Sequence, residues 1–389
     1  MKGKSLSLSS LLLGSLITNT GISFIWPLTT VYMHEYLHET LTIASLVLLI
    51  NAISTVIGNY IGGILFDRWS PYKTMILGIF IEVVTAGILI FQNGWPIYAI
   101  MLVILGFGNG IELTGINSYA TLITSHHPSY VFNMLYFTSN LGLVIGTLIV
   151  GLILQFGISY IFLTATIMFL IFLYIATVYY KNGASIRKSS ASLQKNTLPT
   201  FTRMQIIVIL FVFAVSWIDY EQWQSNISTF MVSKGFTIQD YSYVWTFNAV
   251  LIVIFQPVLT YFDDWLYKHM LLRLNIGFVL YGVSFFILLF DRISYFTILF
   301  SMFILTMGEI LAIPGVAAYV NDKVPIPLRG EYQGIVNASG SAGKAVGPLI
   351  GALLIERISY NFLFLFAAII ILLSIMAFNV TTVFSPKKK

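Results

Sequence analysis

The sequence predicts an all-α membrane protein in which twelve transmembrane helices form two six-helix halves that repeat one another. Composition, a series of long apolar runs and an internal repeat predict this fold. Of the 389 residues, 58% are hydrophobic and 9% are charged, against roughly 25% charged residues in a typical soluble domain. So few charges favour a chain whose surface faces lipid.

Each apolar run of about 20 residues is long enough to cross roughly 30 Å of hydrocarbon as a helix. The first run exceeds the roughly 7–15 residues of a signal-peptide core, so we expect it to be a retained first helix. The predicted helices span residues 8–33, 41–66, 74–92, 97–121, 130–155, 159–180, 204–231, 241–262, 271–290, 294–320, 332–355 and 360–384.

Lys and Arg residues predict the orientation of these helices. If the N-terminus is cytoplasmic, nearly all of them fall in cytoplasmic segments, and only Lys234, Arg292 and Arg357 lie opposite. Cytoplasmic loops carry such an excess of positive charge. We therefore expect a multi-pass protein of the cell membrane with both termini in the cytoplasm. The net charge of +5 lies in these loops, which argues against a nucleic acid partner.

The longest polar stretch, at residues 181–203, predicts the division of the chain. Its Ser, Lys and Asn content is typical of a flexible linker. The predicted halves are residues 1–180 and 204–389.

Motifs at similar offsets indicate that the halves repeat. FDRWSPYK at residues 66–73 is echoed by FDDWLYK at residues 262–268, and GNGIELTGINSY at residues 108–119 by GEILAIPGVAAY at residues 308–319. Many secondary transporters consist of such repeated halves. Glycine pairs of the small-xxx-small form predict close helix contacts: Gly58 and Gly62, Gly142 and Gly146, and Gly343 and Gly347.

At these motifs the chain resembles the major facilitator superfamily over essentially its whole length. GGILFDRWSPYK is similar to that family's Gly-x-Leu-Ala-Asp-Arg-x-Gly-Arg-Lys signature, with matches at Gly63, Leu65, Asp67 and Arg68. More narrowly, TMGEILAIPG at residues 306–315, together with Lys344 on predicted helix eleven, resembles the LmrP-type multidrug/proton antiporters. The resemblance implies a gating role for Gly63, Asp67 and Arg68, with Asp67 contacting the start of helix eleven or its own loop.

Ionisable side chains inside the predicted helices are the candidate proton-coupling residues. A charge at membrane depth costs roughly 2.5–3.5 kcal/mol on insertion scales, so such residues usually face a cavity or a partner. The resemblance implies that helices one, four, seven and ten line a central cavity. The acids on three of these helices are the predicted proton-coupling residues: Glu112, Asp219, Glu221 and Glu309.

These acids also have structural alternatives. Glu309 could be a neutral structural tie, and Asp219 and Glu221 could lie at an exposed helix end. Glu309 occupies the repeat position of Asn109, however, and an amide cannot gain and lose a proton as a carboxyl group does. Glu82, on the peripheral third helix, is expected to serve packing or to pair with a polar group on a neighbouring helix.

The predicted substrate-binding set combines acids, amides and aromatic rings that could stack on a cation. Packing is the alternative role of each ring. The set comprises Asn19, Trp26, Asn109, Glu112, Trp217, Trp223 and Glu309. A buried Lys344 must pair with a carboxylate or lose its proton; we predict Glu309 as its charge partner, with Asp219 or Glu221 next.

The sequence favours transport over catalysis. It has no cysteine, no Gly-rich phosphate loop, no metal-spaced His/Glu pair and no nucleophile motif, so we expect no enzyme activity, no cofactor and no metal. We expect a monomeric, proton-coupled exporter of lipophilic, cationic, drug-like compounds that works by alternating access, with protons, a small-molecule substrate and the bilayer as partners. A proton-coupled importer or lipid translocator is the first alternative, and a non-transporting receptor or scaffold is the second.

Overall fold

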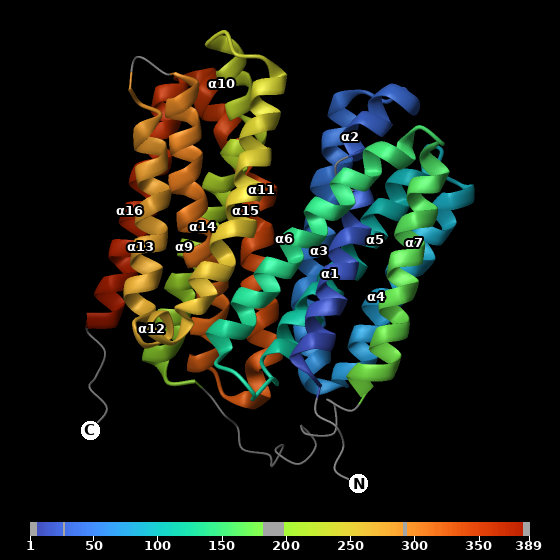
Figure 1. The fold of residues 1–389 in the computed structure, drawn as a ribbon, viewed down its shortest axis with the longest axis horizontal. Coiled ribbons are helices and arrows are strands. Elements are labelled where there is room, and N and C mark those ends of the chain that lie inside the picture. Colours follow the sequence, from blue (N-terminus) through green and yellow to red (C-terminus); the bar gives the residue numbers. More distant parts are fainter. Residues whose placement is uncertain (1–5, 26–27, 182–197, 291–293, 384–389) are drawn as a thin grey trace. The chain divides into compact units, whose positions relative to one another are not determined.

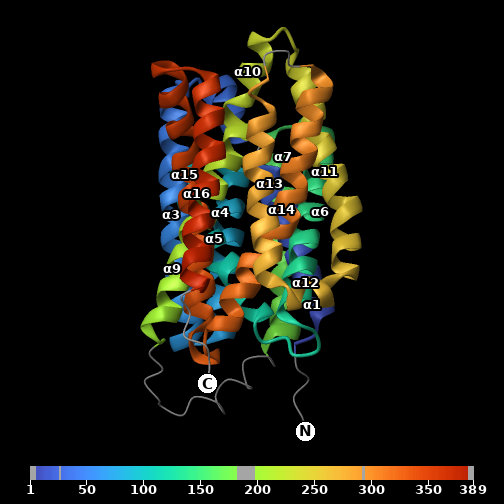
Figure 2. The same ribbon diagram turned by 90° about the vertical axis from the view of Figure 1, so that its left-hand side faces the viewer.

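The computed structural model describes residues 6–25, 28–181, 198–290 and 294–383, and helices make up most of them (Figures 1 and 2). In the N-terminal part, the helices are α1 (Leu8–Ile25), α2 (Thr29–Val31), η2 (Tyr32–Tyr36), α3 (Leu41–Arg68), α4 (Pro71–Phe91), α5 (Ile97–Ala120), α6 (Pro128–Leu154), α7 (Ile158–Ile175) and η3 (Ala176–Tyr180). The later helices are α9 (Thr200–Ser225), α10 (Ile227–Ser233), α11 (Ile238–Tyr261), α12 (Asp263–Lys268), α13 (Met270–Ile287), α14 (Tyr295–Lys323), η5 (Ile326–Leu328), α15 (Arg329–Arg357) and α16 (Tyr360–Val383).

The predicted all-α membrane fold is confirmed. Within the described ranges, eleven helices are long and apolar enough to cross a membrane, and α1 occupies the first predicted span. Two predicted spans differ in detail. The first is described as α1 up to Ile25 and then as α2 and η2 from Thr29 to Tyr36, and the seventh divides at Asn226 into α9 and α10. Residues 182–197 of the predicted linker lie outside the described residues.

Side-chain caps explain where several helices begin. Thr40 accepts a hydrogen bond from the Ile43 amide at 3.2 Å before α3, and Ser70 accepts one from the Lys73 amide at 3.4 Å before α4. Thr237 and Asp240 form a reciprocal capping box at α11. Each cap satisfies an amide that has no carbonyl partner in the first helical turn.

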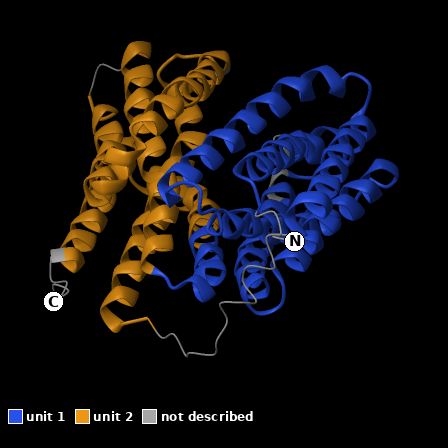
Figure 3. Ribbon diagram, turned by 60° about the horizontal axis from the view of Figure 1, so that its bottom comes forward, with its two compact units in different colours: residues 1–195, 324–338 blue, residues 196–323, 339–389 orange. Residues whose placement is uncertain are grey.

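Two compact units make up the chain, and each contains one copy of the repeat (Figure 3). Unit 1 comprises residues 1–195 and 324–338, and unit 2 comprises residues 196–323 and 339–389. Helix α15 therefore contributes to both units. The simpler division at the linker, into residues 1–180 and 204–389, stays a prediction.

The sequence repeat is matched by a repeat of helix packing. In unit 1, α3 packs on α5, α4 packs on α5 and α7, and α1 packs on α7. In unit 2, α11 packs on α14, α13 packs on α14 and α16, and α9 packs on α16. The same pattern of neighbours thus recurs in helices that follow the same order along the chain.

Glycines allow α3 and α5 to approach closely, as the small-xxx-small spacing predicts. A Cβ atom at Gly58 would contact the backbone carbonyl oxygen of Phe107, and one at Gly62 would lie 2.9 Å from the Cα atom of Ile111. Both obstacles are backbone atoms, which cannot rotate away as a side chain does.

Gly58→Ala should therefore lower the thermal stability of the purified protein. Overpacking costs about 1–3 kcal/mol, so the midpoint of thermal unfolding in detergent should fall. Gly87→Ala in α4 is the matched control, because no atom lies within 4 Å of the added methyl group. Equal midpoints for the two variants would show that the contact between α3 and α5 relaxes freely.

Three helices of unit 2 contain a proline in their interior: Pro257 in α11, Pro314 in α14 and Pro348 in α15. Among the described helices of unit 1, Pro71 and Pro128 lie at helix starts, where no intrahelical amide bond is lost. A proline within a helix removes the amide that would bond to the carbonyl four residues earlier.

Candidate functional site

Glu309 lies at the centre of a polar cluster in unit 2. Its side chain is buried, with 2% exposed. Asn248 of α11 donates a hydrogen bond to the Glu309 Oε2 atom at 3.2 Å and another to the Thr306 Oγ1 atom at 2.9 Å. Tyr220 of α9 interacts directly with Glu309, and the Tyr281 hydroxyl of α13 lies near it. Four helices thus converge on one carboxyl group.

Lys344 of α15 lies beside this cluster. Its ammonium group is 3.7 Å from the centre of the Trp217 ring. No carboxylate in the described part of unit 2 forms an ion pair with it, and its strongest electrostatic neighbour is Glu221, ahead of Glu309. Its side chain is exposed, although protein atoms surround the ammonium. The predicted pairing of Lys344 with Glu309, with Asp219 or Glu221 as the next choice, stays a prediction.

The ring of Trp217 begins a row of aromatic side chains. The Trp217 ring packs edge to face on the Tyr220 ring, with the ring centroids 5.2 Å apart. The Tyr220 ring packs in the same way on the Trp245 ring, with the centroids 5.7 Å apart. Close approach of α9 and α15 holds this row in place, because a Cβ atom at Gly343 would lie 2.9 Å from that of Trp217. The row therefore connects the Lys344 contact to the Glu309 cluster.

The other predicted residues of α9 are buried. Asp219 is 1% exposed and Glu221 is 8% exposed. The Asp219 Oδ2 atom and the Trp223 indole nitrogen have no hydrogen-bond partner among the described residues. The exposed helix end that was the alternative for Asp219 and Glu221 is thereby excluded. Trp223, at 0% exposure, lies in the interior of unit 2.

A second polar cluster lies in unit 1 around Glu112 of α5. Thr18 of α1 donates a hydrogen bond to the Glu112 Oε2 atom at 2.9 Å. Glu82 of α4 interacts directly with Glu112 and accepts a hydrogen bond from the Asn109 amide at 3.3 Å. Glu82 thus has polar partners on the neighbouring helix α5, which is one of the two roles expected for it.

Two remaining substrate candidates lie on or next to α1. The Asn19 amide donates to the Ser15 carbonyl oxygen at 2.7 Å and to the Ser139 Oγ atom at 3.3 Å. The bond to Ser139 ties α1 to α6. Trp26 lies outside the described residues.

The predicted gating residues hold the start of α15 against α3 within unit 1. The Asp67 carboxylate accepts hydrogen bonds from the backbone amides of Gly330 at 3.1 Å and Glu331 at 2.7 Å. Arg68 forms an ion pair with the Glu331 side chain at 3.5 Å. A Cβ atom at Gly63 would lie 2.6 Å from the Gly330 carbonyl oxygen. The predicted contact of Asp67 with this helix is present, and its role in gating stays a prediction.

Sequence reasoning did not identify Asn248, Tyr220 and Tyr281 as site residues. Each is a polar or amphipathic side chain inside an apolar helix, which was the only available signal. Such residues are common in membrane helices, so only packing shows which of them reach a carboxyl group. Within the described ranges, no three acidic or histidine side chains are arranged to hold a metal ion.

Repeated sets of membrane-length helices with carboxyl groups buried inside them define a class of protein, the secondary transporters. The chain belongs to the Major Facilitator Superfamily, whose sequence model matches residues 11–319 and 274–389. The resemblance inferred from the motifs is thereby confirmed at the level of the superfamily. The chain is an integral, multi-pass membrane transporter.

Two proteins of Bacillus subtilis (strain 168) are similar to the chain over most of its length. The "Uncharacterized MFS-type transporter YttB" is 33% identical over 371 residues, which cover 95% of this chain and 93% of that protein. The "Uncharacterized MFS-type transporter YqjV" is 21% identical over 366 residues, which cover 89% of this chain and 86% of that protein.

Solved structures share the fold at low sequence identity. A bacterial homologue of the iron transporter ferroportin, in an outward-facing state, has a TM-score of 0.79 and 15% identity, covering 97% of this chain and 99% of that one. The human organic anion transporter MFSD10 (TETRAN) has a TM-score of 0.76 and 13% identity, covering 95% and 98%. At these identities the likeness shows the fold alone.

Proposed function

We propose that the protein is a proton-coupled exporter of lipophilic cations, with Glu309 as the residue that couples transport to the proton gradient. The observation that carries the proposal is the buried Glu309 carboxyl group, held by Asn248 beside the row of aromatic rings. The helix-ten motif shared with LmrP-type antiporters also supports it. Export takes place across the cell membrane, by a monomer with cytoplasmic termini.

The chemistry around Glu309 suits a group that binds and releases a proton. Asn248 donates to the carboxyl oxygen, and an amide donor stabilises both the charged and the neutral form. The protonated form carries no net charge to bury, whereas the charged form attracts a cation into the same place. Proton and cation therefore compete for one carboxyl group, which is the requirement for exchange transport.

The balance of charge and ring surface in unit 2 favours a cationic substrate. Glu221 and Glu309 lie near Lys344, and Asp219 and Glu309 lie near the Tyr281 hydroxyl. The Trp217 face already accepts an ammonium group. Aromatic faces attract cations by roughly 0.5–2 kcal/mol, and lipophilic cations combine that charge with apolar surface for the neighbouring rings.

Transport in inverted membrane vesicles tests the proposal. An imposed gradient, acidic inside, should drive a fluorescent lipophilic cation into vesicles that contain the protein, and collapse of the gradient should release it. Proton-driven uptake in right-side-out vesicles would instead show an importer. Movement of labelled phospholipid would show a lipid translocator, and binding without transport would show a receptor.

Lys344→Met should tighten binding of the lipophilic cation tetraphenylphosphonium. The Lys344 ammonium occupies the Trp217 face, so its removal frees that face and removes a like charge. A cation–π contact of roughly 0.5–2 kcal/mol corresponds to about a two- to thirtyfold change in Kd, measured by tryptophan fluorescence. Lys323→Met is the control, because Lys323 lies over the ring of Tyr319 instead. Unchanged or weaker binding by Lys344→Met would contradict competition at Trp217.

A further inference from the structure

Two carboxyl groups of unit 1 meet where neither has a positive partner. Glu82 of α4 is 0% exposed and Glu112 of α5 is 1% exposed, and their side chains interact directly. Thr18 donates to Glu112, and Asn109 donates to Glu82. The Glu82 Oε2 atom has no hydrogen-bond partner among the described residues. Each carboxyl group thus has one neutral donor, and one buried oxygen remains to be satisfied.

The helices around this pair supply no compensating charge. Helices α1, α6 and α7 contain no Asp, Glu, Lys, Arg or His, and the charged residues of α3 are Asp67 and Arg68 in its last turn. Lys73 of α4 lies in the first turn of that helix, over the Trp69 ring. The only other titratable group near the pair in the described part of unit 1 is Tyr180, whose hydroxyl donates to the Ser10 carbonyl oxygen at 3.3 Å. Two adjacent carboxylates without a cation repel each other strongly at low dielectric.

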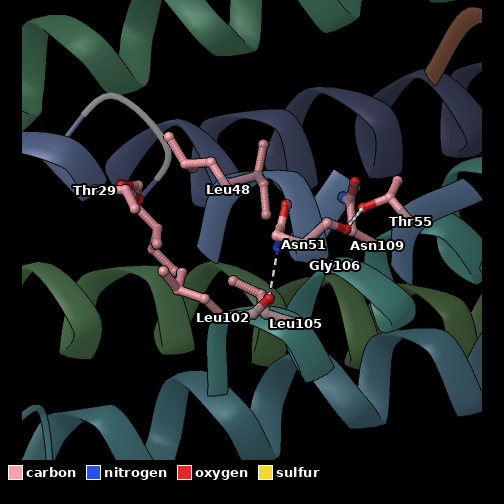
Figure 4. A pocket seen from close by; sticks show the side chains of 10 residues that line it. Thr29, Leu48, Asn51, Thr55, Leu102, Leu105, Gly106 and Asn109 are labelled. Carbon is pink, nitrogen blue, oxygen red and sulfur yellow. Dashed lines mark hydrogen bonds between the residues drawn. The ribbon is translucent and has the colours of Figure 1, made fainter. Parts of the chain in front are cut away.

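A small cavity in unit 1 is lined in part by Asn109, the residue that donates to Glu82 (Figure 4). Its volume is about 60 Å³, and a water molecule needs on the order of 10–15 Å³ by this measure, so several fit. Asn51, Thr55 and Asn109 supply polar lining. Asn109 also donates to Glu82, so one side chain joins the cavity to the carboxyl pair.

We propose that Glu82 and Glu112 hold one proton between them and form a proton-binding site in unit 1 that is separate from Glu309. The proton is bonded to one carboxyl oxygen and hydrogen-bonded to the other group, which gives the free Glu82 oxygen a partner and removes the repulsion. When the proton leaves through the cavity, two carboxylates remain. Any use of this proton in transport rests on the proposed proton coupling, whereas the shared proton itself does not.

Infrared spectroscopy of the purified protein detects this proton through the carbonyl band of a carboxylic acid. The measurement does not require a transport assay. The double variant Glu82→Gln/Glu112→Gln should lose, relative to the wild type at neutral pH, the carbonyl band of one carboxylic acid. Loss of no band would mean that both groups are ionised, and loss of two would mean that both are neutral; either result overturns the proposal. Glu356→Gln, which removes an exposed carboxyl group, is the control and should leave the buried bands unchanged.

The single variants keep the test decisive if the double variant does not fold. Glu82→Gln and Glu112→Gln should each shift the pH at which the remaining carboxyl band titrates, because the partner that shared the proton is gone. Titration that is unchanged from the wild type in both variants overturns the proposal. These results differ from a failure of the proposed function, in which gradient-driven export is missing while the infrared count remains one.

Discussion

Glu309→Gln is expected to abolish uphill, proton-driven export while the protein still folds. The glutamine carbonyl oxygen accepts the Asn248 hydrogen bond in place of the Glu309 Oε2 atom, so the helix contacts are retained. An amide does not gain or lose a proton near neutral pH. The proton gradient therefore has no titratable group at position 309 to act on. Accumulation of a lipophilic cation in inverted vesicles should fall to the level of vesicles without the protein.

Two further variants show whether the loss at Glu309 is specific. Glu309→Asp keeps a titratable group on a shorter side chain and should retain part of the uphill export. Glu356→Gln removes an exposed carboxyl group from α15 and should export at the wild-type rate. Full gradient-driven accumulation by Glu309→Gln would return Glu309 to a structural role.

Asp67→Asn should loosen the start of α15 from α3. The Asp67 carboxylate accepts from two backbone amides at the first turn of α15, where the helix dipole also favours negative charge. The amide removes the charge and one of the two acceptor oxygens. Hydrogen bonds to a charged group are worth roughly 1.5–3 kcal/mol, which corresponds to a population shift of about ten- to a hundredfold.

Distances between spin labels on the cytoplasmic face measure this shift. The chain has no cysteine, so paired labels can be placed on introduced cysteines without background. Asp67→Asn should increase the population of long distances, as expected for a bias toward the inward-open state. Asp264→Asn, in α12 of the repeated motif in unit 2, is the control. Distances unchanged from the wild type at every pH would remove Asp67 from the conformational equilibrium.

Most of the fold could be predicted from local features of the sequence. The features that determine the helices act within a few residues of one another or on one helix face. They are the apolar runs, caps such as Thr40 and Ser70, and glycine pairs such as Gly58 and Gly62. The division at Asn226 was missed because the polar residues that follow Trp217 are compatible with either a continuing helix or a break.

The candidate site was predictable only in part, for a physical reason. Glu309 and Asp67 were identified because each lies in a recognisable motif. The partners of these residues depend on which helices pack together: Asn248 is 61 residues from Glu309, and Glu82 lies on a different helix from Glu112. The partner of Lys344 depends on packing in the same way, because position along a helix does not determine which groups a long side chain reaches.

Prolines in α14 and α15 of unit 2 remove backbone hydrogen bonds beside the proposed site. Pro314 removes the regular amide donor for the carbonyl of Ile310, the residue after Glu309, and Pro348 removes the one for the carbonyl of Lys344 itself. Bending at either point sacrifices no regular backbone hydrogen bond, because that bond is already missing. Glu309, the proposed coupling residue, and Lys344, which occupies the Trp217 face, therefore lie where their helices resist bending least. Unit 2 thus has elastic compliance directly beside the proposed proton-binding carboxyl group.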